Sequence, residues 1–444
     1  MKQRGLSHIQ IIALGYFCIV LVGAFLLMLP IATRTGSSAP FGTALFTSVS
    51  ASCVTGLVLE NTVTYWSIFG QVVILTLIQL GGLGYMTIAT VFYRLIIRKR
   101  GLREKVIMAE SINTTRMNDF SGLIKKIFWG TLIIEGIAAV LLSIRFIPIF
   151  GLLKGIYYSI FHSISAFCNA GFDLLGNPTP FNSLVSFNND PLIIIVISLL
   201  IILGGLGFLV WDDLIVKRFR FKKLNLHSKI VLCTTAFLLI IGTCLFYLFE
   251  HNKSLGDMST GTKLLNSFFS SVTPRTAGFN SIDIASLSES SKLLTVILMF
   301  IGGNSGSTAG GIKTTSLFVM SAFVFSSIRG KSSITAFNKS IKNEFLNKAL
   351  LITFINLSLA LSGAFIICAT EPVSLSHALI ETFSAISTVG LTAGITTTLG
   401  TTSQIVLMLL MYCGRVGSVS FAVALFEKKH SAPITYPAES ITVG

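Results

Sequence analysis

The chain has 444 residues, of which 52% are hydrophobic and only 11% are charged, and its mean hydropathy is +0.80. A soluble globule of this size keeps a large polar surface in water, so this composition excludes a soluble domain and indicates a protein embedded in a lipid bilayer. The net charge of +15 would suit a nucleic-acid-binding protein, but the basic residues do not form one patch along the sequence.

Apolar runs long enough to cross about 30 Å of hydrocarbon recur along the whole chain. The first run follows Lys2 and Arg4, as in a secretory signal, but it is too long for one and lacks a small-residue cleavage site. We therefore expect it to be the first helix of a multi-pass membrane protein. In chain order the runs are 9–30, 68–92, 123–144, 191–216, 230–249, 346–369 and 403–426.

The basic residues alternate with the apolar runs. Of the 33 Lys and Arg residues, 24 lie at the N-terminus, in every second connecting loop and just after the last run. This is the positive-inside pattern, and it predicts a cell-membrane protein with both termini in the cytoplasm, in contact with lipid and not with nucleic acid. The basic stretches are Lys2 and Arg4, then 94–126, 217–229 and 329–348, then Lys428 and Lys429.

A glycine context recurs four times, each time after a short amphipathic stretch that contains Phe and Ser or Thr. The glycines are 115, 107 and 112 residues apart, and each is followed directly by Leu or Phe. A long apolar run precedes each glycine and another follows it. In three of the following runs a matching glycine tetrad occurs, at 81–84, 204–207 and 414–417, for which helix packing is the favoured role. The recurring glycines are Gly56, Gly171, Gly278 and Gly390.

These repeats predict an all-α polytopic membrane protein with four pseudo-symmetric units of helix, pore half-helix, loop and helix around one central pore. Each half-helix, at roughly 12 residues, is too short to cross the bilayer, so eight full helices and four half-helices are expected. Unit 1 covers residues 1–100, unit 2 covers 101–225, unit 3 covers 226–343, and unit 4 covers 344–444 with a C-terminal tail.

Irregular backbone at membrane depth persists only where it is buried in protein or lines a water-filled path. A ring of backbone carbonyls can replace the water around a cation, and glycine adopts the dihedral angles that aim the carbonyls inward. The four loops therefore predict a single-layer K⁺ selectivity filter; the alternative is that the glycines only allow close helix packing. The predicted filter residues are Val54, Thr55 and Gly56; Asn169, Ala170 and Gly171; Thr276, Ala277 and Gly278; and Thr388, Val389 and Gly390.

Unit 3 differs from the others, because a Gly-rich stretch interrupts its second apolar run. This composition cannot hold a helix, since each glycine costs about 1 kcal/mol relative to alanine. A mobile gate just inside the filter is the favoured interpretation, and a static polar lining is the alternative. Its resemblance to a phosphate loop fails, because an extra residue precedes Lys313. The stretch comprises Gly302, Gly303, Asn304, Ser305, Gly306, Ser307, Thr308, Ala309, Gly310 and Gly311.

Arg415 stands inside the last apolar run, where an unpaired charge is expensive and usually functional. It could bond to the carbonyls of the Gly-rich stretch, repel ions, or extend to the inner surface. Arg275 is expected to brace its loop from behind. Glu135 and His162 are expected to be satisfied structurally, and most of the seven cysteines are expected to be small packing residues without disulfides.

With these features placed, the chain resembles the Trk/Ktr/HKT superfamily of K⁺ transporters over essentially its whole length. It looks most similar to the membrane subunit of the bacterial Ktr type. The resemblance implies Na⁺-promoted K⁺ uptake, a homodimer, and control by a cytosolic ring of nucleotide-sensing RCK subunits. It places the filter at the four glycines, the gating loop at 302–311 with Lys313, and the arginine that pairs with the gating loop at Arg415. The Na⁺-selective plant members have serine at the position of Gly56, so the glycine here favours K⁺.

Two alternatives from other functional classes are a secondary transporter of another cation or small solute, and an intramembrane enzyme. Parallel repeats suit an axial pore better than the inverted repeats of many transporters. An enzyme would need a nucleophile–base pair or a metal cluster, and the six histidines are scattered. We therefore expect that the chain is not an enzyme and has no cofactor of its own. K⁺ is expected as the transported ion, bound in this chain only at the filter, and nucleotide is expected only on the regulatory partner.

Overall fold

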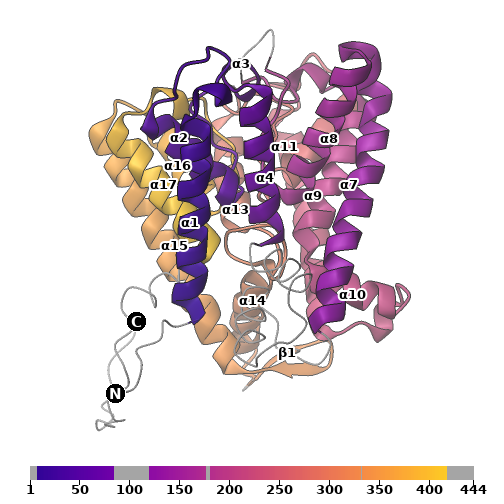
Figure 1. The fold of residues 1–444 in the computed structure, drawn as a ribbon. Coiled ribbons are helices and arrows are strands. Elements are labelled where there is room, and N and C mark those ends of the chain that lie inside the picture. Colours follow the sequence, from indigo (N-terminus) through magenta and orange to yellow (C-terminus); the bar gives the residue numbers. More distant parts are fainter. Residues whose placement is uncertain (1–7, 85–119, 177–180, 332, 418–444) are drawn as a thin grey trace, which may run out of the picture.

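A computed structural model describes residues 8–84, 120–176, 181–331 and 333–417. Almost every regular element in these ranges is a helix, and the helices stand roughly side by side (Figure 1). This confirms the predicted all-α membrane fold. The helices α1 (His8–Met28), α2 (Phe41–Cys53), α3 (Thr62–Tyr65) and α4 (Ile68–Leu83) come from unit 1, and α7 (Phe120–Phe150), α8 (Leu152–Cys168), α9 (Pro191–Leu206) and α10 (Phe208–Val216) come from unit 2.

The second half of the chain follows the same order of long helix, short helix and second helix. Short 3-10 turns join some of these helices, and a two-stranded antiparallel hairpin of β1 (Ile334–Ala336) and β2 (Lys339–Ile341) precedes the last unit. Unit 3 contains α11 (Leu226–Glu250), α12 (Thr260–Val272), α13 (Glu289–Phe300) and α14 (Thr314–Ile328), and unit 4 contains α15 (Asn343–Thr370), α16 (Leu375–Ile386) and α17 (Thr401–Val416).

The short helices α2, α8, α12 and α16 have 13, 17, 13 and 12 residues. Each packs against the long helix that precedes it, and the second helix of each unit packs against the short helix of the next. Thus α4 contacts α8, α9 contacts α12, α13 contacts α16, and α17 contacts α2. The last pair closes a ring in which the four short helices alternate with the four second helices.

The second helix of unit 2 is bent, whereas the predicted runs 68–92 and 403–426 extend beyond the described residues, which end at 84 and 417 in these segments. In unit 2 the apolar run 191–216 is not one straight helix, because α9 ends at Leu206 and α10 leaves it at an angle of 92°. Gly207, with φ of 94°, makes the bend, since L-residues rarely adopt that angle. In the described residues, α11, α15 and 125–150 of α7 are long and apolar enough to span a membrane, and α9 with α10 counts as a fourth span.

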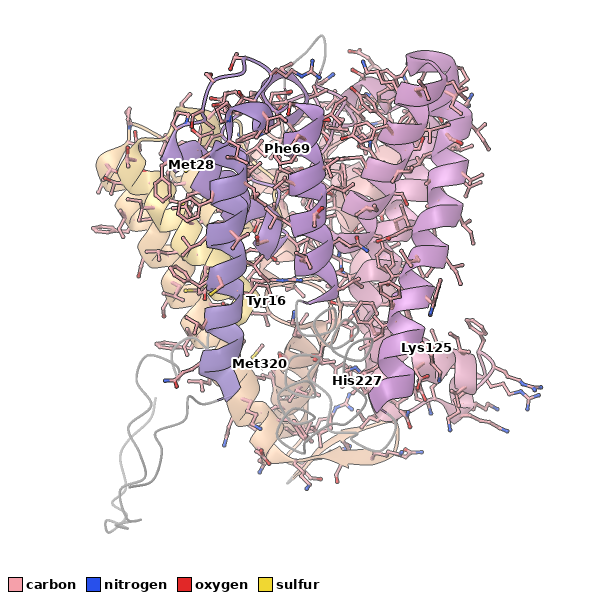
Figure 2. The ribbon with its side chains drawn as sticks, in the orientation of Figure 1. Tyr16, Met28, Phe69, Lys125, His227 and Met320 are labelled. Carbon is pink, nitrogen blue, oxygen red and sulfur yellow. The ribbon has the colours of Figure 1, made fainter. Side chains whose placement is uncertain are left out.

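The basic segments that the structure describes lie at one end of the molecule. The α10–α11 connection and the hairpin of β1 and β2 lie at this end in Figure 1, and Figure 2 shows Lys125 and His227 near it. Phe337 and Asn338 turn the hairpin with φ of 49° and 60°. Lys229 lies 5.9 Å from the ring centres of both Phe221 and Phe337, so aromatic contacts connect the hairpin to the α10–α11 connection.

Candidate functional site

Three of the short helices end in the same way. After Ser50, Ser165 and Ser384 the chain closes a Schellman motif, whose terminal residue is left-handed and is usually glycine. Here that residue is Val54, Asn169 or Thr388, with φ of 58°, 60° and 50°. In unit 1, for example, the N–H of Thr55 donates to the carbonyl of Ser50 at 2.8 Å and that of Val54 donates to the carbonyl of Ala51 at 3.1 Å.

Unit 3 reaches the same conformation by a different route. Pro274 has no N–H, so α12 ends at Val272, and the N–H of Ala277 donates instead to the carbonyl of Thr273 at 3.0 Å. Thr276 nevertheless has φ of 79°. All four loops therefore place a left-handed residue two positions before their glycine.

The four loop glycines meet in a closed ring, which we call the glycine ring. Gly56, Gly171, Gly278 and Gly390 have φ of 98°, 69°, 83° and 93°. A Cβ added to Gly171 would lie 2.8 Å from the carbonyl oxygen of Ala277 in the next unit, and one on Gly278 would lie 2.5 Å from that of Val389. Added Cβ atoms on Gly56 and Gly390 would clash with the carbonyls of Ala170 and Thr55, which completes the circle.

Hydroxyl groups hold these loops from behind. Ser50 and Ser384 accept hydrogen bonds from the N–H groups of Gly56 and Gly390 at 3.0 and 2.9 Å. Ser165 donates to the carbonyl of Phe172 at 2.7 Å, and Thr273 donates to that of Phe279. The Leu or Phe after each glycine is at most 1% exposed, so it anchors the loop in the core.

These braces leave the backbone carbonyls of the twelve predicted filter residues unused. In the described part of the chain, no hydrogen bond ends on any of those carbonyl oxygens. Carbonyls inside a protein almost always find a partner, so carbonyl oxygens without one are available to a ligand or to water. The side chains of Val54, Asn169, Thr276 and Thr388 are themselves at most 1% exposed.

The Gly-rich loop of unit 3, residues 302–311, lies against the second helix of unit 2. The N–H of Asn304 and its side-chain amide donate to the carbonyl of Gly205 at 3.1 and 2.8 Å, and the N–H of Thr308 donates to that of Gly204 at 3.3 Å. The N–H of Phe208 donates back to the carbonyl of Gly306 at 2.8 Å. The bend at Gly207 frees these groups from α9, so the tetrad 204–207 both packs and binds the loop.

The other side of the loop faces unit 4. A Cβ on Gly310 would lie 2.7 Å from the carbonyl of Ser387 and would clash with the hydroxyl of Thr388. Within unit 3, Lys313 Nζ donates to the carbonyls of Ala309 at 2.7 Å and Gly310 at 3.3 Å. The loop thus lies directly beside the loop of unit 4 that contains Gly390.

Arg415 joins the loop to two other units. Its guanidinium donates to the carbonyl of Thr308 in the Gly-rich loop and to that of Gly81 in unit 1. Of the three interpretations left open by the sequence, these contacts match bonding to the loop. Ser305 and Ser307 lie at the more exposed side of the loop, where Ser307 donates to the carbonyl of Asn304 at 2.7 Å.

The remaining polar residues have structural partners. Arg275 points to α11, where it donates to the hydroxyl of Thr235 at 3.3 Å, so it braces its loop from behind as predicted. His162 contacts the carbonyl of Tyr158 at 2.7 Å and accepts from the N–H of Leu174 at 3.3 Å. Glu135 accepts from the amide of Gln79 at 3.2 Å, which joins units 2 and 1.

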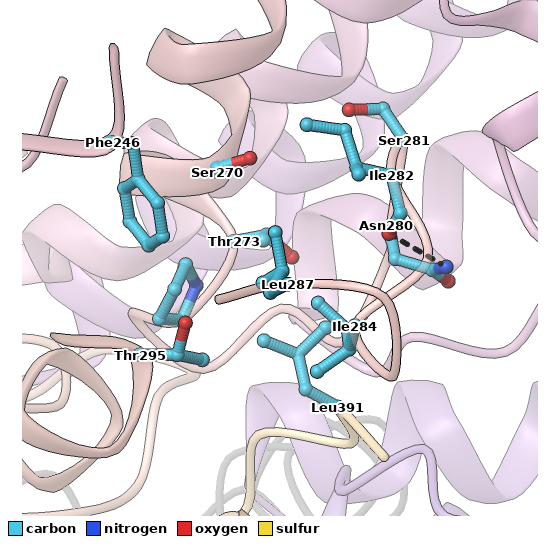
Figure 3. Close-up of a pocket in the computed structure, with 11 residues that line it drawn as sticks. Phe246, Ser270, Thr273, Asn280, Ser281, Ile282, Ile284, Leu287, Thr295 and Leu391 are labelled. Carbon is cyan, nitrogen blue, oxygen red and sulfur yellow. Dashed lines mark hydrogen bonds between the residues drawn. The ribbon is translucent and has the colours of Figure 1, made fainter. Parts of the chain in front are cut away.

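Sequence analysis missed Glu381, a fully buried carboxylate in α16. It accepts hydrogen bonds from Thr392 and, at 2.8 Å, from Thr396, and so fixes the chain that leaves Gly390. A lone acid inside an apolar short helix was the available signal. Figure 3 shows a small pocket behind the third loop, lined among others by Thr273, Asn280 and Leu391. No group of three potential His, Cys, Asp or Glu metal ligands occurs among the described residues.

The comparisons agree with one another. Residues 9–434 match the TrkH family, described as "Cation transport protein". The chain is 43% identical to the "Potassium/sodium uptake protein NtpJ" of Enterococcus hirae, over 100% of this chain and 99% of that protein. It is 40% identical to the "Ktr system potassium uptake protein B" of Bacillus subtilis, over 98% and 96%.

A solved structure shares the fold. The "Potassium Transporter TrkH" from Vibrio parahaemolyticus superposes with a TM-score of 0.74 at 16% identity, covering 96% of this chain and 86% of that one. The family match and the full-length relatives together identify the family of this chain. The chain belongs to the TrkH family of cation transport proteins, as a multi-pass membrane protein.

Proposed function

We propose that this chain is the ion-conducting membrane subunit of a K⁺ uptake system and that K⁺ crosses through the glycine ring. The observation that carries the proposal is the set of twelve backbone carbonyls without hydrogen-bond partners among the described residues, around four glycines with positive φ. Neutral carbonyls can replace the water of a K⁺ ion without trapping it by net charge. The names of the relatives, which refer to potassium or to potassium and sodium, support the same ion.

The gate of this pathway is the Gly-rich loop. It lies beside Ser387 and Thr388 at the end of the fourth filter loop. Gly204 of unit 2 and Arg415 of unit 4 bind it directly, and Arg415 also donates to the carbonyl of Gly81 in unit 1. Because its bonds to α9 involve neutral backbone and amide groups, the only charged partners of the loop among the described residues are Arg415 and Lys313. In this proposal the bound loop is the closed state.

Regulation and assembly rest on the family resemblance. Na⁺ promotes the uptake, the chain forms a homodimer, and a cytosolic RCK-type ring that binds nucleotide opens the gate. The described basic segments, which share one end of the molecule, support a cytoplasmic orientation of that end and hence of both termini. They also offer the surface on which an acidic partner would bind.

A transporter for an organic solute is the competing function. It would need side chains that recognise the solute at mid-membrane, whereas the glycine ring presents backbone oxygens. A growth assay at low K⁺ distinguishes a K⁺ uptake protein from an organic-solute transporter. In bacteria that lack their own K⁺ uptake, the chain expressed with its regulatory subunit should restore growth at low K⁺. No restoration by protein that reaches the membrane would contradict the proposal.

A further inference from the structure

The residue two positions before each loop glycine differs among the units in a way that the ring does not require. It is Asn169, Thr276 and Thr388 in units 2, 3 and 4, but Val54 in unit 1. All four are left-handed and at most 1% exposed. We propose that Asn169, Thr276 and Thr388 form a second cation site from side-chain oxygens at the inner end of the glycine ring, with Val54 as its apolar corner.

The oxygens of this layer lack the partners that buried oxygens normally have. Asn169 Oδ1 and Thr388 Oγ1 have no hydrogen-bond partner among the described residues. Leaving such atoms unpaired in a protein interior costs free energy, so a bound ion or a water at these two oxygens would lower that cost. The layer therefore contains two acceptors that are free to bind a cation.

A hydrogen bond between two of these side chains leaves the amide oxygen of Asn169 without a partner. The amide nitrogen of Asn169 donates to the hydroxyl of Thr276 at 3.3 Å, across the boundary between units 2 and 3. This bond orients the amide so that its nitrogen is used and its oxygen is not. It also brings the oxygens of two neighbouring units together.

Thr388 is oriented by its methyl group. An added Cβ on Gly414 would lie 3.2 Å from its Cγ2, so the methyl packs toward α17. Its hydroxyl faces Gly310 of the Gly-rich loop, where an added Cβ would clash with it. The loop in its bound position therefore covers this oxygen, and the site becomes complete only when the loop moves away.

The chemistry of the layer suits a large monovalent cation. Its ligands are a neutral amide and two hydroxyls, whose weak field cannot remove the tightly held water of a small or divalent ion. Three side-chain oxygens do not replace a full hydration shell, so the ion keeps water on the Val54 side. The site would hold K⁺ part-way between the inner solution and the carbonyls.

This inference rests on the proposed function, and its test separates the two. We would measure the concentration dependence of ⁸⁶Rb⁺ uptake into proteoliposomes for the wild type, Thr388→Val and Thr388→Ser. Valine keeps the shape but loses the oxygen, so the apparent KM for Rb⁺ should rise about five- to tenfold. Serine keeps the hydroxyl, so its KM should stay within about twofold of the wild type.

A second pair of variants keeps the test decisive if one of the Thr388 variants does not fold. Asn169→Leu removes the amide oxygen and should raise the KM, whereas Val54→Thr adds a fourth oxygen at nearly constant volume and should lower it. Saturable uptake by the wild type with an unchanged KM in these variants would overturn the second site alone. A change in maximal rate without a change in KM would also overturn it, because it would show a role in the loop contact only. Absence of wild-type Rb⁺ uptake would overturn both proposals.

Discussion

Arg415 donates a hydrogen bond to the backbone carbonyl of Thr308, a residue 107 positions earlier in the chain. The same guanidinium donates to the carbonyl of Gly81 in unit 1. The planar guanidinium presents several donors at once, so one side chain can hold carbonyls from two segments. The Gly-rich loop of unit 3 is in this way tied to units 1 and 4.

Replacing Arg415 by Ala should raise basal ion flux. A hydrogen bond from a charged group contributes about 1.5–3 kcal/mol, and losing one from the closed state shifts the closed–open ratio by about tenfold or more. The measurement is ⁸⁶Rb⁺ uptake by proteoliposomes without the regulatory ring.

Arg415→Lys is the matched control, because it keeps the charge but cannot bond both carbonyls in the same geometry. If the bonds hold the loop, the Lys variant should also leak. Wild-type flux in the Lys variant, with raised flux in the Ala variant, would show that the positive charge acts by repelling ions and not as a latch.

Removing residues from within 303–310 should also raise basal flux, since the bonds of Asn304 and Thr308 to α9 are lost with the loop. The flux should reach at least the level of Arg415→Ala, because Arg415 then has no loop to hold. Unchanged flux in a variant with normal expression would show that the loop does not obstruct the pathway.

Gly207→Ala should weaken the docking of the loop. Alanine at φ of 94° is strained, and its Cβ would lie 2.8 Å from the carbonyl of Ser305. Gly205→Ala is the control in the same tetrad, since its Cβ would approach only Asn169 Nδ2, at 3.6 Å. We expect raised flux from the first variant and nearly wild-type flux from the second; equal effects would exclude a specific role for the bend.

Gly56→Ser should reduce the discrimination of K⁺ over Na⁺. A side chain there would clash with the carbonyl of Ala170 and displace one quarter of the ring. Gly42 lies in α2, the short helix that precedes the Gly56 loop, with open space around it, so Gly42→Ser should leave selectivity unchanged. The concentrations of K⁺ and of Na⁺ that each halve ⁸⁶Rb⁺ uptake are measured separately, and their ratio gives the selectivity. The same ratio in the wild type and in Gly56→Ser would count against the ring as the filter.

Glu381→Gln should lower the thermal stability of the purified protein and slow uptake. Thr392 and Thr396 donate to different carboxylate oxygens, and the Gln amide has an NH2 group in place of one of them, so one hydroxyl loses its carboxylate acceptor at a cost of about 1–3 kcal/mol. Glu344→Gln, on the exposed N-terminal turn of α15, is the control and should leave Tm unchanged. A normal Tm in the Glu381 variant would show that this carboxylate does not hold the fourth loop.

The order of elements and the ring could be predicted because both depend on local patterns. A glycine that must be left-handed recurs at nearly constant spacing, and the Leu or Phe after it must be buried in every unit. Arg415 and residues 302–311 were found because charge and glycine are each expensive in a membrane helix.

What sequence reasoning missed depends on contacts between distant segments. An apolar run such as 191–216 satisfies the bilayer whether it is straight or bent, so hydropathy gave no sign of the 92° angle at Gly207. The carbonyls of Gly204 and Gly205 became visible as partners of the loop only when α9 and residues 304–308 were placed side by side. Glu381 was overlooked because its acceptor role depends on Thr392 and Thr396, beyond the short helix that contains it.

The most direct test of K⁺ conduction through the glycine ring is ⁸⁶Rb⁺ uptake by proteoliposomes that contain only this chain, driven by an outward K⁺ gradient and measured with and without Na⁺. Uptake should saturate, external K⁺ should compete with it, choline should not, and added Na⁺ should increase it. Uptake no greater than that of empty liposomes, in both the wild type and the leaky Arg415→Ala variant, would contradict a K⁺ pathway through this chain.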